Sequence, residues 1–206
     1  MSKRSRILFI SVVFAAGIFC YPAFAQVENG KAAPNFTLKD SNGNDVSLSQ
    51  FQGKYVVLEW LNHDCPFVKK HYGSGNMQNL QKTYTGKGVT WLSIISSAPE
   101  QQGYYEAADI NRLNAEKKAS PTAILLDPAG TVGKLYGAQT TPHMYIIDPG
   151  GVLVYQGAID DIRSTNPDDV ARARNYVSAA LDEAMAGKPV STPSTKSYGC
   201  SVKYQQ

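Results

Sequence analysis

The chain has 206 residues, with 20 basic and 17 acidic side chains and a formal net charge of +3 at pH 7. The first 25 residues hold three of the basic side chains and no acidic one, so the remainder carries 17 of each sign. Nucleic-acid binding needs a concentrated basic surface, and this balance excludes it as the expected function. The remaining ~180 residues are enough for one domain with a complete hydrophobic core.

Residues 1–25 have the pattern of a secretory signal peptide. Three basic side chains begin it, residues 7–19 are apolar, and Ala23-Phe24-Ala25 supplies the small residues that a signal peptidase needs. The apolar segment is shorter than the ~20 residues of a membrane-spanning helix. We therefore expect a periplasmic or secreted protein with no stable membrane span, and an uncleaved N-terminal anchor is the alternative.

Strands and helices then alternate along the chain. We predict strands at residues 35–38, 46–48, 55–61, 89–96 and 122–126, and helices at residues 66–84 and 104–118. Asn42-Gly43 between the first two apolar runs is a strong hairpin signal. The run at 55–61 is apolar on both faces, as in a central parallel strand. The first helix is expected to break or kink near Gly73-Ser74-Gly75.

The last third of the domain predicts an antiparallel hairpin and a final helix. The hairpin strands are expected at residues 144–148 and 152–155, and the helix at residues 168–186, where apolar side chains recur at helical spacing. This order of elements predicts an α/β fold, a mixed sheet with helices on both faces. Residues 188–206 are rich in Pro, Ser and Thr and are expected to form a flexible tail that carries Cys200.

The most informative residue is Cys65. It follows a strand-like run and precedes Pro66, at the point where a helix begins. A helix N-terminus offers unpaired N–H groups and the positive end of the macrodipole, which favour a thiolate, the nucleophilic form of cysteine. The alternative is an inert buried cysteine. Because Cys20 leaves with the signal peptide, Cys200 is the only other cysteine of the mature chain, and an oxidising compartment allows the two to pair.

Three segments resemble the thioredoxin fold, in the branch shared by peroxiredoxin-like (AhpC/TSA) and TlpA/ResA-like secreted proteins. They are residues 59–68 around Cys65, residues 141–148 (Thr-Pro-His-Met-Tyr-Ile-Ile-Asp), and the hairpin arm at residues 151–157. The resemblance covers residues 33–186, so residues 26–187 are expected to be one thioredoxin-like redoxin domain. It also implies a cis-proline at Pro142.

Two departures from these families concern the residues around Cys65. Thioredoxins carry a second cysteine three residues after the first, where this chain has Val68. Peroxiredoxins carry a Pro-x-x-x-Thr-x-x-Cys motif, and here Leu58 and Asn62 replace the proline and the threonine. The chain therefore lies between the two families and matches neither motif fully.

Cys200 and Glu59 are the candidate catalytic partners of Cys65. Thiol–disulfide exchange needs a second sulfur, and Cys200 on a flexible tail is the candidate resolving cysteine; a structural disulfide or a free thiol is the alternative. Glu59 matches the buried acid beneath the thioredoxin active site. Burial there would raise its pKa and allow it to exchange a proton with a nearby sulfur. An exposed glutamate or an internal salt bridge is the alternative.

The resemblance implies that Pro66, Thr141, Pro142 and His143 bind the substrate. In this fold the loop of the cis-proline lies against the active-site sulfur, and its exposed backbone can pair with a partner chain. An ordinary turn proline at Pro142 is the alternative.

All three histidines lie near these motifs: His63 and His71 around Cys65, and His143 beside Pro142. Thiolate and imidazole ligands suit copper. A histidine could instead lower the pKa of the Cys65 thiol.

These residues predict an exported thiol-dependent oxidoreductase, peroxiredoxin-like in kind. Cys65 would attack a peroxide or a disulfide, and Cys200 would resolve the product. A thiol–disulfide oxidoreductase without peroxidase activity, a copper-binding chaperone of the same fold and a non-catalytic binding module are the alternatives. No nucleotide-binding loop or flavin motif is visible, so we expect no organic cofactor, and the electron donor is not predicted.

Overall fold

A computed structural model describes residues 27–205, so the predicted signal peptide lies outside the described residues. Its main sheet has the strand order β2-β1-β5-β4-β3-β7-β8. The strands are β1 (Thr37–Asp40), β2 (Asp45–Ser47), β3 (Val56–Trp60), β4 (Thr90–Ile95), β5 (Ala123–Leu126), β7 (His143–Ile147) and β8 (Leu153–Gly157). The predicted strands are confirmed, with ends that differ by no more than two residues.

The centre of the sheet is parallel and its two sides are antiparallel. β3, β4 and β5 run in the same direction. β7 is antiparallel to β3, and β1 is antiparallel to β5. β3 is the strand that leads to Cys65, and it lies between β4 and β7 with every residue buried. This explains why its sequence is apolar on both faces.

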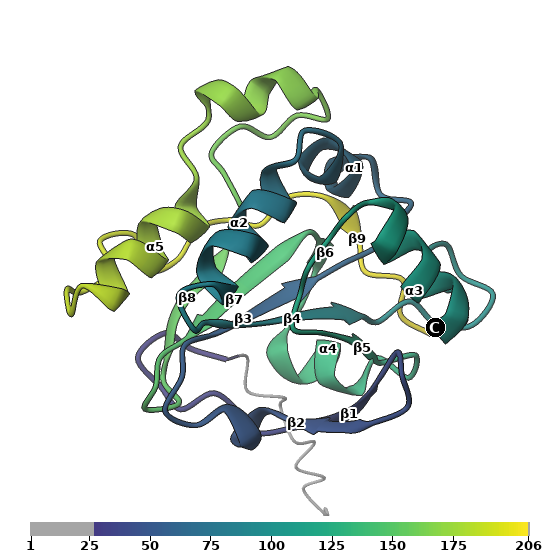
Figure 1. Cartoon of the computed structure of the whole chain (residues 1–206), viewed down its shortest axis with the longest axis horizontal. Helices are drawn as coiled ribbons and strands as arrows, with labels where there is room; N and C mark the ends of the chain where they lie inside the picture. Colours follow the sequence, from purple (N-terminus) through teal and green to yellow (C-terminus); the bar gives the residue numbers. More distant parts are fainter. Residues whose placement is uncertain (1–26, 206) are drawn as a thin grey trace, which may run out of the picture.

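Helices cover both faces of the sheet, as Figure 1 shows. They are α1 (Pro66–Gly73), α2 (Asn76–Thr85), α3 (Ala107–Glu116), α4 (Thr131–Tyr136) and α5 (Tyr176–Met185), with 3-10 helices η1 (Leu48–Phe51) and η2 (Pro167–Arg172). α1, α2, α3 and α5 pack on one face, and α4 with η1 packs on the other. The mixed α/β sandwich predicted from the sequence is therefore confirmed.

The alternation of side chains along β3 builds these two layers. Val57 belongs to the core under α1, α2 and α5, whereas Leu58 and Trp60 belong to the core over α4. The break between α1 and α2 falls at the predicted glycines, and Gly75 has φ +76°, a conformation that favours glycine. Glu59 is two residues after Val57 on β3, so its side chain faces the same layer, which contains α1, α2 and Cys65.

The prediction of one final helix over residues 168–186 is wrong. The segment forms η2 and, after a break, α5, because Asn166 and Asn175 each cap a separate helix by accepting a hydrogen bond from the backbone. The sequence also missed α4. This helix has only six residues and lies between Gly130 and Gly137, both with positive φ, so it offers too few turns for a periodic pattern.

The segment 188–206, expected to be a flexible tail, is instead seated on the domain along its described length. Cys200 and Ser201 form β9, which pairs with β6 (Thr140–Thr141) in a second, two-stranded sheet. Tyr198 and Val202 are buried on either side of β9. Apolar burial and backbone pairing therefore fix the segment that carries Cys200. In Figure 1 it crosses from α5 beneath α1 towards α3.

None of the helices in residues 27–205 has both the length and the apolar character that crossing a membrane requires.

Candidate functional site

Cys65 occupies the N-cap of α1 and is fully buried. β3 ends at Trp60, and Cys65 keeps an extended backbone (φ −65°, ψ 124°) before Pro66 begins the helix. Proline fits this first position because its missing N–H would have had no partner within the helix. Of the first-turn N–H groups, that of Val68 interacts with the Cys65 sulfur and lowers the pKa of this thiol.

The loop of Pro142 lies against this sulfur. The Thr141–Pro142 peptide bond is cis, which confirms the expectation from the resemblance. In its thiol form, Cys65 Sγ donates to the backbone oxygen of Thr141 at 2.9 Å. A residue at the start of α1 and the loop before β7 thus meet across 76 positions of sequence.

The backbone of this loop is already paired, by the chain's own C-terminal segment. In the antiparallel β6–β9 pair, Cys200 lies opposite Thr141. Gly199 makes this approach possible, because a Cβ at that position would collide with the backbone oxygen of Thr141. The strand-pairing edge expected to receive a partner chain is therefore occupied by β9 in this structure.

The two thiols are both free and affect each other's protonation. Burial raises the pKa of Cys65, but interactions with the Cys200 side chain, the N–H groups of Val68 and Cys200, and the Thr141 hydroxyl lower it, and the net shift is downward. Burial and the Cys65 sulfur raise the pKa of Cys200 to about 11. Cys65 is therefore the thiol suited to act as nucleophile, and Cys200 keeps its proton at neutral pH.

The Thr141 hydroxyl provides one test of this arrangement. It is buried, has no hydrogen-bond partner of regular geometry among the described residues, and lowers the pKa of Cys65. Thr141→Val preserves the shape of the side chain and removes the hydroxyl. We expect the pH profile of Cys65 alkylation by iodoacetamide to move to higher pH. A profile identical to that of the wild type would contradict this role of the hydroxyl.

Glu59 lies in the core, where its carboxylate accepts four hydrogen bonds. The donors are Tyr72 Oη at 2.8 Å, Trp91 Nε1 at 2.8 Å, Ser93 Oγ at 2.9 Å and Gln81 Nε2 at 3.3 Å. Burial raises the pKa of Glu59, and these hydrogen bonds oppose the shift. The expected raised pKa is present, whereas none of the hydrogen bonds that the carboxylate makes in residues 27–205 reaches Cys65. Proton exchange with Cys65 stays a prediction.

The three histidines are separated and uncharged at neutral pH. Burial lowers the pKa of His63, of His71 and of His143 to about 4 in each case. None of them therefore supplies the positive charge that would lower the pKa of Cys65. Within the described range, no group of three His, Cys, Asp or Glu side chains lies close enough to hold a metal ion. The copper alternative gains no support from this geometry.

The other residues predicted to bind the substrate differ from one another in exposure and in position around Cys65. Pro66 is exposed at the start of α1, Pro142 follows the Cys65 contact at Thr141, and His143 is buried at the start of β7. Tyr145 Oη and the backbone N–H of Gln139 lie 3.3 and 3.4 Å from His143 Nδ1. His143 thus points into the protein, and its side chain helps to hold the β6–β7 loop.

Comparison with known proteins shows the family of the chain. The sequence model of the AhpC/TSA family matches residues 29–156. The chain belongs to the AhpC/TSA family.

Individual relatives of this AhpC/TSA chain come from both branches of the resemblance. Thiol-disulfide oxidoreductase ResA of Bacillus thuringiensis is 28% identical over 166 residues, which cover 75% of this chain and 88% of ResA. Peroxiredoxin Q, chloroplastic, of Triticum aestivum is 30% identical over 149 residues, which cover 68% of this chain and 62% of peroxiredoxin Q.

A solved structure gives the same fold over most of the chain. The crystal structure of an uncharacterized conserved protein from Geobacillus kaustophilus superposes with a TM-score of 0.74 at 30% identity. It covers 88% of this AhpC/TSA chain and 94% of the other. The thioredoxin-like fold is therefore shown by sequence and structure together.

Asn62 takes a structural role at the position where the peroxiredoxin motif has threonine. Its amide Nδ2 donates to the backbone oxygen of Gln102 at 3.2 Å, and its Oδ1 accepts from the backbone N–H of Asp64 at 2.8 Å. Asn62 is buried, and these bonds fix the loop before Cys65. Asn62 therefore supplies no hydroxyl, whereas the hydroxyl of Thr141 lowers the pKa of Cys65.

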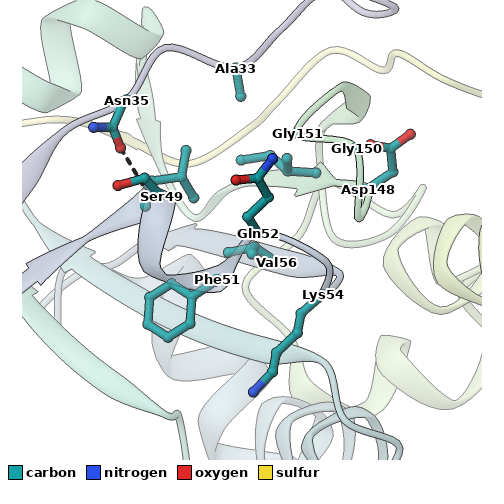
Figure 2. Close-up of a pocket in the computed structure, with 12 residues that line it drawn as sticks. Ala33, Asn35, Ser49, Phe51, Gln52, Lys54, Val56, Asp148, Gly150 and Gly151 are labelled. Carbon is teal, nitrogen blue, oxygen red and sulfur yellow. Dashed lines mark hydrogen bonds between the residues drawn. The ribbon is translucent and has the colours of Figure 1, made fainter.

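Figure 2 shows an apolar pocket lined by Val56, among other residues. Val56 begins β3, whereas Cys65 follows the other end of that strand. Phe51, Lys54 and Val56 line it near the start of β3, and Asp148 lines it after the end of the antiparallel β7. It contains none of the predicted site residues, so the chemistry of this AhpC/TSA chain is not placed there.

Sequence reasoning missed the side chains that hold the C-terminal segment in place. Tyr198 lies two residues before Cys200 and is buried against Lys70, His71 and Asp160. Burial of Lys70 and Asp160 was not predicted, because charged residues are expected at the surface. In the sequence, only Cys200, the candidate resolving cysteine, pointed to this part of the chain as a site.

Proposed function

We propose that the chain is an exported thiol-dependent oxidoreductase that cycles Cys65 and Cys200 between a dithiol and a disulfide. The observation that carries this proposal is the position of Cys200, opposite Thr141 and beside the buried Cys65 sulfur. The lowered pKa of Cys65 and the raised pKa of Cys200, about 11, give the two thiols different roles.

In the first step, the Cys65 thiolate attacks a hydroperoxide. A sulfur–oxygen bond forms and the oxygen–oxygen bond breaks, so the sulfur becomes a sulfenic acid while the peroxide is reduced to an alcohol or to water. The leaving oxygen takes one proton. The Cys65 pocket favours this step because hydrogen-bond donors surround the charged form of the sulfur.

In the second step, the Cys200 sulfur attacks the sulfenic acid of Cys65. The sulfur–sulfur bond forms, the sulfur–oxygen bond breaks, and the departing hydroxide leaves as water with the Cys200 proton. A thiol of high pKa holds its proton until this step, and the short approach to Cys65 compensates for its low thiolate fraction. An external dithiol then reduces the disulfide and is itself oxidised.

A hydroperoxide fits the closed site better than a protein disulfide. Cys65 has no exposed surface, and β9 occupies the edge of β6 on which a protein chain would pair. A small oxidant needs only a local opening, whereas a protein substrate must displace β9. Exchange with a protein disulfide is the second candidate, and the similarity to ResA, a thiol-disulfide oxidoreductase, favours it.

Export is part of the same proposal. Residues 1–25 have the signal pattern described above. An oxidising compartment allows a Cys65–Cys200 disulfide to accumulate, and an external reductant must then regenerate the dithiol.

The test is stopped-flow mixing of the reduced protein (residues 26–206) with hydrogen peroxide, with Cys65→Ser as the control. We expect consumption of one equivalent per chain, much faster than for a free thiol, and none in Cys65→Ser. The same protein is mixed with oxidised glutathione. Consumption of peroxide at the rate of an ordinary thiol would overturn the peroxidase assignment. Fast reaction with oxidised glutathione, together with slow reaction with peroxide, would support the second candidate, disulfide exchange.

A further inference from the structure

Tyr198 ends in a buried polar cluster, which we define as Lys70, His71 and Asp160. Lys70 and His71 come from α1, and Asp160 follows β8. Lys70 Nζ lies 3.1 Å from Asp160 Oδ2, and the two side chains are 0% and 2% exposed. Lys70 Nζ also donates to the backbone oxygen of Ile162 at 2.8 Å. The cluster thus contains a buried ion pair, Lys70 and Asp160, whose other polar atoms need hydrogen-bond partners from neighbouring residues.

The hydroxyl of Tyr198 meets that need. It donates to Asp160 Oδ1 and lies 3.2 Å from His71 Nε2. Asn76 Nδ2 donates to His71 Nδ1 at 2.9 Å, so the proton of the neutral imidazole is on Nε2 and is donated to the Tyr198 oxygen. A directional chain of hydrogen bonds therefore runs from Asn76 through His71 and Tyr198 to Asp160.

The ring of Tyr198 is held as firmly as its hydroxyl. It makes an edge contact with Phe67 of α1, at 5.7 Å between ring centroids, and Lys70 Nζ lies 5.7 Å from its centroid. Both contacts are made by the helix whose N-cap is Cys65. Tyr198 therefore ties the C-terminal segment to the element that positions the nucleophile.

We propose that Tyr198 is a positioning residue for Cys200: its hydroxyl fastens the C-terminal segment to the buried polar cluster and so holds β9 on β6, with Cys200 beside Cys65. Only Gly199 separates the two residues, and its backbone lies so close to Thr141 that no side chain fits there. A displacement of Tyr198 is therefore transmitted directly to Cys200. The catalytic part of this inference rests on the proposed function.

The polar cluster also explains how the segment can open. A cavity beside it is lined by Asp160, Arg163, Tyr176, Thr195 and Tyr198 among others, so water can reach the Asp160 carboxylate when Tyr198 leaves. Solvated charges cost less free energy than buried unpaired charges. Departure of Tyr198 therefore exposes the Asp160 carboxylate to water and does not leave an unpaired charge buried.

The experiment compares Tyr198→Phe with the wild type by two readouts. The first is amide hydrogen exchange of residues 199–203 in the reduced protein, where the N–H of Val202 bonds to Gln139. We expect exchange about tenfold faster, as loss of a hydrogen bond to a charged group implies. The second is the rate of Cys65–Cys200 disulfide formation after one equivalent of peroxide, which should fall while the rate of Cys65 oxidation is unchanged.

Two further variants calibrate these readouts. Tyr55→Phe removes a hydroxyl that donates to the backbone oxygen of Ala184 at 2.7 Å, near the end of α5 and before the C-terminal segment begins, and should change neither readout. Gly199→Ala introduces the collision with Thr141 and should increase exchange of residues 199–203 by at least as much as Tyr198→Phe.

Unchanged exchange of residues 199–203 in Tyr198→Phe, with increased exchange in Gly199→Ala, would overturn the proposal. Faster exchange with an unchanged rate of disulfide formation would also overturn the positioning role. Absence of any Cys65–Cys200 disulfide in the wild type is a failure of the proposed function, and the exchange readout distinguishes it from failure of the Tyr198 contact.

Discussion

Cys200→Ser is expected to oxidise once and then stop. Cys65 keeps its N-cap position and its contact with Thr141, so the first reaction with peroxide stays fast and produces a stable sulfenic acid. No second sulfur is present to displace the oxygen, and excess peroxide carries Cys65 on to sulfinic acid, which thiols do not reduce. Turnover with a dithiol reductant is therefore lost, and mass spectrometry of the Cys65 peptide measures the product.

Serine is the appropriate replacement because it keeps a small hydrogen-bond donor beside Cys65. Loss of turnover then reports the missing sulfur and not a large change in the pKa of Cys65. Cys65→Ser is the matched variant, and it should lose both the first oxidation and turnover. Continued turnover in Cys200→Ser, at a rate close to that of the wild type, would contradict the resolving role of Cys200.

Glu59→Ala is expected to destabilise the fold by at least about 3 kcal/mol, because several buried hydrogen-bond donors lose their partner at once. The substitution leaves the hydrogen-bond donors of Tyr72, Trp91, Ser93 and Gln81 without their shared acceptor in the core. Each unsatisfied buried group costs about 1–3 kcal/mol. Urea denaturation followed by circular dichroism measures the free energy of unfolding. A loss below about 1 kcal/mol would contradict this account of the network.

Glu59→Gln separates charge from shape. Burial raises the pKa of Glu59 in the folded protein above its ordinary value, so the folded state binds the proton more tightly than the unfolded state. The resulting stabilisation is complete below the ordinary glutamate pKa and is lost as the pH rises through the raised pKa. The free energy of unfolding of the wild type relative to Glu59→Gln should therefore fall over that interval. A difference independent of pH would show that the pKa of Glu59 is not raised.

The sequence predicted the part of the site that is formed by residues adjacent in the chain. An apolar strand, Cys65, Pro66 and a helix follow one another along the chain, and each local preference agrees with the fold. The glycines at 73 and 75 similarly placed the break between α1 and α2. The cis bond before Pro142 came from the family resemblance, since the residues alone give cis only a low frequency.

The other part of the site depends on contacts between distant residues, which no local pattern reports. Lys70 and Asp160 are 90 positions apart and are both buried, although charged residues are expected at the surface. A Pro- and Ser-rich composition is typical of flexible segments and predicted a flexible tail. Composition alone does not show that Tyr198 and Val202 are buried against the domain. In η2 and α5, two asparagine caps outweighed an apolar spacing that fitted one helix.

The most direct measurement of the central claim is peptide mapping of the reduced protein (residues 26–206) after reaction with one equivalent of hydrogen peroxide. The proteolytic peptides are separated without reduction and identified by mass spectrometry. Because Cys200 lies beside Cys65, we predict one dominant product, in which the peptides of Cys65 and Cys200 are joined by an intramolecular disulfide. A sulfenic or sulfinic acid at Cys65 with Cys200 still free, or disulfides only between two chains, would contradict the account.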